Sequence, residues 1–163
     1  MRKYIIFILW IIGVFLLQSS PLYEHIGVRG VTPDFLLIMI SLAAFILGPI
    51  AGQIIGFITG FIMDIIPAVE LLGLSAFAFT LIGYVVGIAG QKVYGNSVLI
   101  IITLLFVVTL VKAIVLSIFA ALFLEPGYFG YFSHGKIFLE AVLNSIIAPV
   151  LLIIFTKIER KIA

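Results

Sequence analysis

Four polar residues interrupt long apolar stretches of the sequence. Their side chains could form ion pairs, transfer protons or bind a ligand. They are Asp64, Lys112, Glu140 and Asn144. An ionisable side chain within an apolar stretch is costly, and it is usually either paired or functional. The four residues could therefore form an architectural ion pair, relay a proton or an ion, or bind a ligand or a partner helix.

No catalytic motif accompanies these residues. The sequence contains no cysteine, which removes thiolate metal sites and cysteine nucleophiles. It also lacks a glycine-rich phosphate loop, the His-Glu-x-x-His motif of zinc hydrolases and the Gly-x-Ser-x-Gly motif of serine hydrolases. We therefore expect a protein that is not an enzyme and that uses neither a metal nor a cofactor.

The composition places the four polar residues in a membrane. Of the 163 residues, 64% are hydrophobic and 10% are charged. A typical soluble domain is about 45–50% apolar and about 25% charged. These values exclude an ordinary soluble domain and a disordered chain. The nine Lys and Arg residues form no cluster denser than three in five, so we expect the lipid bilayer as a partner and no nucleic acid.

Six apolar runs, separated by Gly, Pro and Asn turn signals, are the elements that must position the polar residues. They cover residues 4–20, 34–47, 50–66, 73–90, 98–124 and 137–157. Because the runs are continuous rather than alternating, they predict helices and not strands. The predicted fold is an all-α integral membrane protein with one transmembrane domain of six helices.

The basic residues predict the orientation of these helices. The second run is short, with 15 residues from Pro33 or about 22 Å of helix, so a re-entrant loop is the alternative to a span. Six spans with a cytoplasmic N-terminus leave six Lys and Arg residues inside and two outside, whereas five spans leave three inside. Cytoplasmic loops carry the excess of Lys and Arg, so we predict six spans with both termini cytoplasmic. The first run has no good cleavage site, and we expect a retained span rather than a signal peptide.

Depth along the helices predicts which polar residues meet. Asp64 and Lys112 each lie about 21 Å from the inner end of their run, at about 1.5 Å per residue. Asn144 reaches a similar level from the outer side, and Glu140 lies about one turn closer to the outside. The simplest partner for Lys112 is therefore Asp64, with Glu140 as the second candidate. We favour an architectural pair, and the relay and the ligand or partner site stay open.

Small residues predict where two helices approach closely. Gly52, Gly56 and Gly60 recur at every fourth position of the third run, with Asp64 next in the series. They form one stripe of a helix, which suits a packing seam. The second run opens with Thr32, Pro33 and Asp34, which predict an N-cap, a first helical residue and an acid in the first turn.

An ordered series of short motifs follows, from about residue 30 to residue 92. It comprises Pro33-Asp34, Gly48-Pro49, Gly56 to Asp64, Gly73-Leu74-Ser75 and Gly83-Tyr84 with Gly87. This series, at this chain length, resembles the rod shape-determining protein MreD family. One departure is that Ile46 and Leu47 stand before the Gly-Pro turn, where the family often has a basic residue.

The resemblance implies a function that the residues alone do not. MreD proteins are inner-membrane components of the bacterial cell-elongation machinery, without enzymatic activity, and they work with MreC, MreB and the RodA–transpeptidase pair that builds peptidoglycan. Their fold is similar to the six-helix substrate-binding subunits of energy-coupling-factor transporters. Two functions are therefore expected: a membrane scaffold that binds partner helices, or a vitamin-binding transporter subunit. Whether the chain forms a homo-oligomer stays open.

Overall fold

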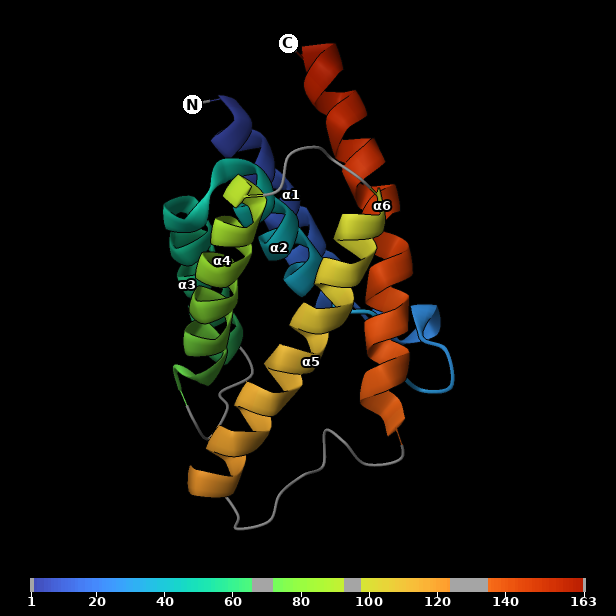
Figure 1. Ribbon diagram of the computed structural model, residues 1–163. Coiled ribbons are helices and arrows are strands. Elements are labelled where there is room, and N and C mark those ends of the chain that lie inside the picture. Colours follow the sequence, from blue (N-terminus) through green and yellow to red (C-terminus); the bar gives the residue numbers. More distant parts are fainter. Residues whose placement is uncertain (1, 66–71, 93–97, 124–134, 163) are drawn as a thin grey trace.

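Six α-helices make up almost all of the computed structural model, which describes residues 2–65, 72–92, 98–123 and 135–162 (Figure 1). Their bounds are α1 Arg2–Gln18, α2 Phe35–Leu47, α3 Pro49–Ile65, α4 Leu74–Lys92, α5 Val98–Phe123 and α6 Lys136–Ile162, with a 3-10 helix, η1 Pro21–Ile26, after α1. No strand occurs within these ranges. The prediction of an all-α fold with six helices is confirmed.

Each helix coincides with one predicted apolar run. The largest difference is at α6, which continues past residue 157 to Ile162, and the other described ends differ from the predicted runs by at most two residues. Residues 66 and 124, with which two of the predicted runs end, lie outside the described residues. Among the described residues, three helical stretches are long and apolar enough to cross a membrane, namely Leu74–Lys92, Val98–Phe123 and Lys136–Lys157. The apolar stretches Ile6–Gln18, Phe35–Leu47 and Pro49–Ile65 are shorter.

Helix α2 is the centre of the bundle. Its ten residues from Leu36 to Phe45 are all buried, and it contacts each of the other five helices. A helix that is apolar on every side can be covered by other helices or by lipid, and α2 is covered by other helices. Among the described α-helices, α2 is therefore both the shortest and the most completely enclosed by protein.

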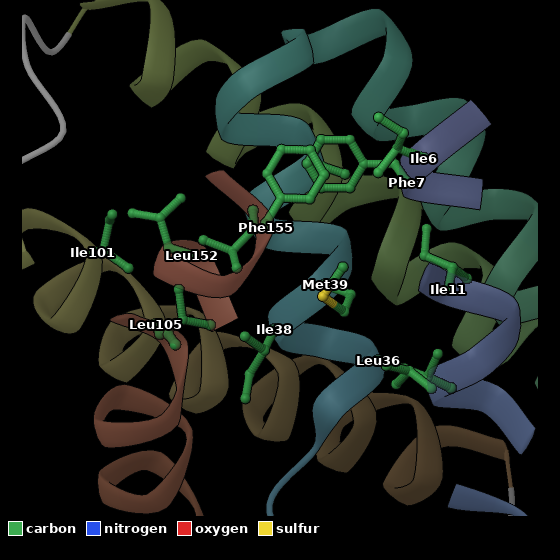
Figure 2. Close-up of a cluster of buried hydrophobic side chains, with 14 residues drawn as sticks. Ile6, Phe7, Ile11, Leu36, Ile38, Met39, Ile101, Leu105, Leu152 and Phe155 are labelled. Atoms are coloured by element: carbon green, nitrogen blue, oxygen red, sulfur yellow. The ribbon is translucent and has the colours of Figure 1, made fainter. Parts of the chain in front are cut away.

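Two hydrophobic clusters hold the other helices to α2. The first joins α2 to α1, α5 and α6, and Figure 2 shows Met39 of α2 among side chains from these helices. Within it, the rings of Phe7 and Phe155 stack with centroids 4.1 Å apart, which ties α1 to α6. The second cluster joins α2 to α4 through residues that include Leu37, Phe79 and Ile82.

The helices α3 and α4 approach each other most closely, along the predicted glycine stripe. A Cβ atom added to Gly52 would lie 2.5 Å from the carbonyl oxygen of Gly83, and one added to Gly60 would lie 2.5 Å from that of Ser75. Gly56 faces the backbone of Phe79 in the same way, and Gly87 faces Pro49. The backbones therefore touch, and no larger residue fits at these positions without moving a helix.

Candidate functional site

A network of polar side chains lies at the N-terminal end of α2, and Lys112 of α5 is its cation. The Lys112 ammonium donates hydrogen bonds to Asp34 Oδ2 at 2.6 Å and to Glu140 Oε1 at 3.1 Å. The side chains of Lys112 and Asp34 are 15% and 9% exposed, and that of Glu140 is 19% exposed. The two carboxylates therefore keep the lysine charged in a largely apolar setting.

Asp34 serves two elements at once. Its Oδ1 accepts a hydrogen bond from the amide of Leu37 at 3.0 Å, so that Asp34 is the N-cap of α2. The predicted N-cap at Thr32 is wrong, because α2 begins at Phe35 and its free amides face the Asp34 carboxylate. A negative charge at this place is also stabilised by the helix dipole.

Asn144 of α6 connects Asp34 to α5. Its Oδ1 accepts from the backbone amide of Asp34 at 2.8 Å, and its Nδ2 donates to Thr109 Oγ1 at 3.0 Å. The Thr109 hydroxyl in turn donates to the carbonyl oxygen of Leu105 at 2.8 Å. Asn144 and Thr109 are fully buried, and the hydrogen bonds offset the cost of burying both side chains.

Two residues that sequence reasoning missed complete the network from the side of α1. Gln18 accepts from the amide of Leu36 at 3.1 Å, and it donates to Tyr23 Oη at 3.1 Å and, weakly, to Asp34 Oδ1 at 3.4 Å. Gln18 lies about 24 Å along α1 from Arg2, so the same depth argument that selected Lys112 could have found it.

Tyr23 of η1 closes the connection between α1 and α2. Its hydroxyl donates to the carbonyl oxygen of Pro33 at 2.5 Å. Burial raises the pKa of the Tyr23 phenol, with a smaller contribution from the negative charge of Asp34, while hydrogen bonds from Thr32 and Gln18 act in the opposite direction. The phenol therefore stays protonated and remains a donor at neutral pH.

The predicted Asp64–Lys112 pair does not form. Asp64 is almost completely buried, but its carboxylate accepts from the amides of Gly73 at 2.9 Å, Ser75 at 3.2 Å and Ala76 at 3.2 Å. It therefore caps the first turn of α4 from the end of α3. Depth counting compares positions along separate helices, and it contains nothing about which neighbour each side chain faces.

The remaining motif residues shape turns or lie on the surface. Gly48 and Gly73 adopt positive φ angles of 93° and 99°, which glycine adopts without strain. Pro49 is the first residue of α3, a position that suits proline. Tyr84 of α4 is 43% exposed and takes no part in the network.

The network suits a structural role better than a catalytic one. Its hydrogen bonds join α1, η1, α2, α5 and α6, and its donors and acceptors are mainly directed at one another. In the described ranges, no group of three or more His, Asp or Glu side chains could hold a metal ion. Three charged side chains, buried or partly buried, and four neutral ones hold the helices in position, and many of their hydrogen bonds converge on Asp34 and the first turn of α2.

This fold and this network define an all-helical membrane protein with polar residues that fix the packing of its helices. The family model of the rod shape-determining protein MreD matches residues 1–162, so the chain belongs to the MreD family. This family is non-enzymatic and acts in the determination of rod shape. No curated protein and no solved structure matches the chain.

Proposed function

We propose that this protein is a non-catalytic scaffold of the bacterial cell-elongation machinery in the inner membrane. It binds MreC, and through the assembled complex it associates with MreB and the RodA–transpeptidase pair. The observation that carries this proposal is the match of the MreD model to essentially the whole chain, at residues 1–162. Membership of a non-enzymatic membrane family agrees with a structure whose described residues are almost entirely helical.

The distribution of polar and apolar surface supports a scaffold. The buried polar groups bond mainly to one another, as a frame for the helices requires. Large apolar side chains are exposed on every helix except α2, including Leu9 at 63%, Leu99 at 74% and Ile146 at 62%. Such surfaces suit lipid and partner transmembrane helices.

A vitamin-binding transporter subunit is the alternative, and the pocket chemistry disfavours it. A vitamin site needs several polar side chains that converge on a cavity. A groove between α1 and α3 has a volume of about 350 Å³, and Thr59 is its one polar lining residue. The six-helix count fits the fold of these transporter subunits, but the groove offers a polar ligand almost nothing to bind.

The proposed topology has both termini in the cytoplasm. Figure 1 shows the N- and C-terminal ends at the same end of the bundle, as an even number of crossings requires. The basic residues Arg2, Lys3, Lys92 and Lys157 belong to that end under this topology, which satisfies the positive-inside rule.

Isolation of the native complex tests the proposed function. The protein is purified in mild detergent from membranes of its own cells, and the polypeptides and small molecules retained with it are identified by mass spectrometry. We expect a stoichiometric single-span protein with a periplasmic domain and no vitamin. Retention of a vitamin, without a stoichiometric elongation protein, would establish the transporter subunit instead.

A further inference from the structure

An apolar groove runs between α1 and α3 on the surface of the bundle. It has a volume of about 350 Å³, and four residues of α1 and six of α3 line it. Both helices pack against α2, so they form the walls of the groove. Several lining side chains are widely exposed, including Ile12 and Ile58 at 52% each.

The lining residues have the spacing of helix-packing stripes. On α1 they are Ile8, Ile11, Ile12 and Phe15, and on α3 they are Ala51, Ile54, Ile55, Ile58, Thr59 and Ile62. Both sets follow the i, i+3, i+4, i+7 pattern with which one helix faces another. The α3 stripe is about 16 Å long, which is about three helical turns. Isoleucine has few side-chain conformations in a helix, so these walls are stiff before anything binds.

Thr59 provides the second observation. It lines the groove and is only 5% exposed, yet its hydroxyl makes no hydrogen bond within the described part of the chain. Thr80, Thr109 and Ser145 each donate to the carbonyl of the residue four positions earlier, whereas Ser41 and Ser117, which do not line the groove, also lack a partner. A nearly buried hydroxyl without a partner is unfavourable, and a hydrocarbon chain cannot supply one.

We propose that a transmembrane helix of a partner protein lies in the α1–α3 groove and hydrogen-bonds to Thr59. The partner helix carries apolar residues at i, i+3, i+4 and i+7, with a hydrogen-bonding side chain or an accessible backbone carbonyl at the depth of Thr59. This inference rests on the proposed scaffold function, and it assigns the surface with which the scaffold binds. The paired stripes and the unbonded hydroxyl favour a helix over an acyl chain.

Photocrosslinking at matched depths tests the assignment. A benzophenone amino acid replaces Ile12 or Ile58 in the groove, and Val107 on α5 as the control. Ile58 lies nine residues after the start of α3 and Val107 nine residues after the start of α5, so both are about 14 Å deep. Val107 is 51% exposed and lies outside the groove. Irradiation is done in native membranes, and the crosslinked peptides are sequenced.

The expected result is a crosslink from both groove positions to the membrane segment of a single-span protein, with at most a tenth of that yield from Val107. Crosslinks from the groove to lipid alone, or to a second copy of this chain, would overturn the assignment. A partner captured only from Val107 would overturn it too, while leaving the scaffold function standing. If no position captures a partner and none copurifies, the scaffold function itself fails.

Substitution of Thr59 tests the hydrogen bond separately. Thr59→Val keeps the shape and removes the hydroxyl, and Thr59→Ser keeps the hydroxyl. Because hydrogen bonds between membrane helices are weak on average, we expect about a threefold lower crosslink yield from Ile58 in Thr59→Val and an unchanged yield in Thr59→Ser. Equal yields in both variants, at equal amounts of protein in the membrane, would contradict a bond to Thr59.

Discussion

Asp34 divides its carboxylate between two partners. Oδ1 caps α2 through the Leu37 amide, and Oδ2 accepts from Lys112. Asparagine also caps helices well, so Asp34→Asn removes the charge and leaves a capping oxygen. The charge interaction and the cap can therefore be separated by choosing asparagine or alanine at this position.

The Asp34–Lys112 interaction should be strongly non-additive. Asp34→Asn leaves Lys112 with Glu140 as its remaining carboxylate, and Lys112→Met leaves two carboxylates without a cation. Each change should lower the free energy of unfolding by about 2 kcal/mol. The double variant should recover about 1 kcal/mol of the summed loss, because the Asp34–Lys112 interaction is lost only once and Glu140 is then the one carboxylate of the three-residue cluster left without the lysine. Equilibrium unfolding in detergent measures the free energy of unfolding of the original protein, the two single variants and the double variant.

Glu140 provides the internal comparison for this cycle. It lies farther from the Lys112 ammonium than Asp34 does, at 3.1 Å against 2.6 Å, and it is more exposed. Glu140→Gln should therefore cost less than Asp34→Asn. Additive losses for Asp34 and Lys112, or a larger loss at Glu140, would show that Asp34 is not the principal partner.

Asp64 should behave independently of Lys112. Asp64→Ala removes three hydrogen bonds to the start of α4 and the charge that faces its helix dipole, at a cost of about 2 kcal/mol. Since Asp64 and Lys112 share no partner, the loss in Asp64→Ala with Lys112→Met should equal the sum of the single losses within about 0.5 kcal/mol. The free energy of unfolding of the single and double variants tests this additivity. Strong coupling would instead support the Asp64–Lys112 pair predicted from the sequence.

At the scale of the elements, the close contact of α3 and α4 depends on its glycines. Gly56→Leu should prevent this contact, since its first side-chain carbon would already meet the backbone of Phe79. Overpacking of this kind typically costs about 1–3 kcal/mol, and more where backbones touch. We expect the amount of Gly56→Leu protein in the membrane to fall severalfold, as measured by quantitative immunoblotting.

Gly13 is the matched control for this prediction. It is also a helical glycine in an apolar helix, but an added Cβ would meet no atom within 4 Å. Gly13→Leu should therefore accumulate normally. If Gly56→Leu accumulates as well as Gly13→Leu, the α3–α4 contact is looser than this packing indicates.

The elements were predictable from sequence because apolar runs and turn residues are local signals. Gly48-Pro49 ends α2 and starts α3, and the four-residue spacing from Gly52 marks the seam. The contacts of Asp34 were not predictable in this way. Asp34 and Lys112 are 78 positions apart, and only the central position of α2, which follows from packing with all five other helices, brings them together.

At the scale of the whole molecule, we infer from positions along the helices that the polar residues lie in one layer across the bundle. Gln18 lies about 24 Å from the start of α1, Asp64 about 22 Å from the start of α3 and Lys112 about 21 Å from the start of α5. Asp34 caps the start of α2 at the level of Lys112, and Asp64 caps the start of α4. Helices α2 and α4 therefore have their N-termini in this layer, with an acid against each positive helix end.

The direction of this layer in the membrane leads to the last prediction. If both termini are cytoplasmic, the layer lies towards the periplasm and the Gly48-Pro49 turn lies towards the cytoplasm. A reporter that is active only in the periplasm should then be inactive when fused after Ala163 and active when inserted after Arg29, an exposed residue of the α1–α2 connection. The reverse result, or activity at both places, would contradict six crossings with cytoplasmic termini.

Cysteine labelling gives an independent check of the same topology. A cysteine in place of exposed Lys92 should react with a membrane-impermeant maleimide only after the membrane is opened. A cysteine in place of Arg29 should react in intact spheroplasts, and since the chain has no cysteine of its own, each signal reports one position.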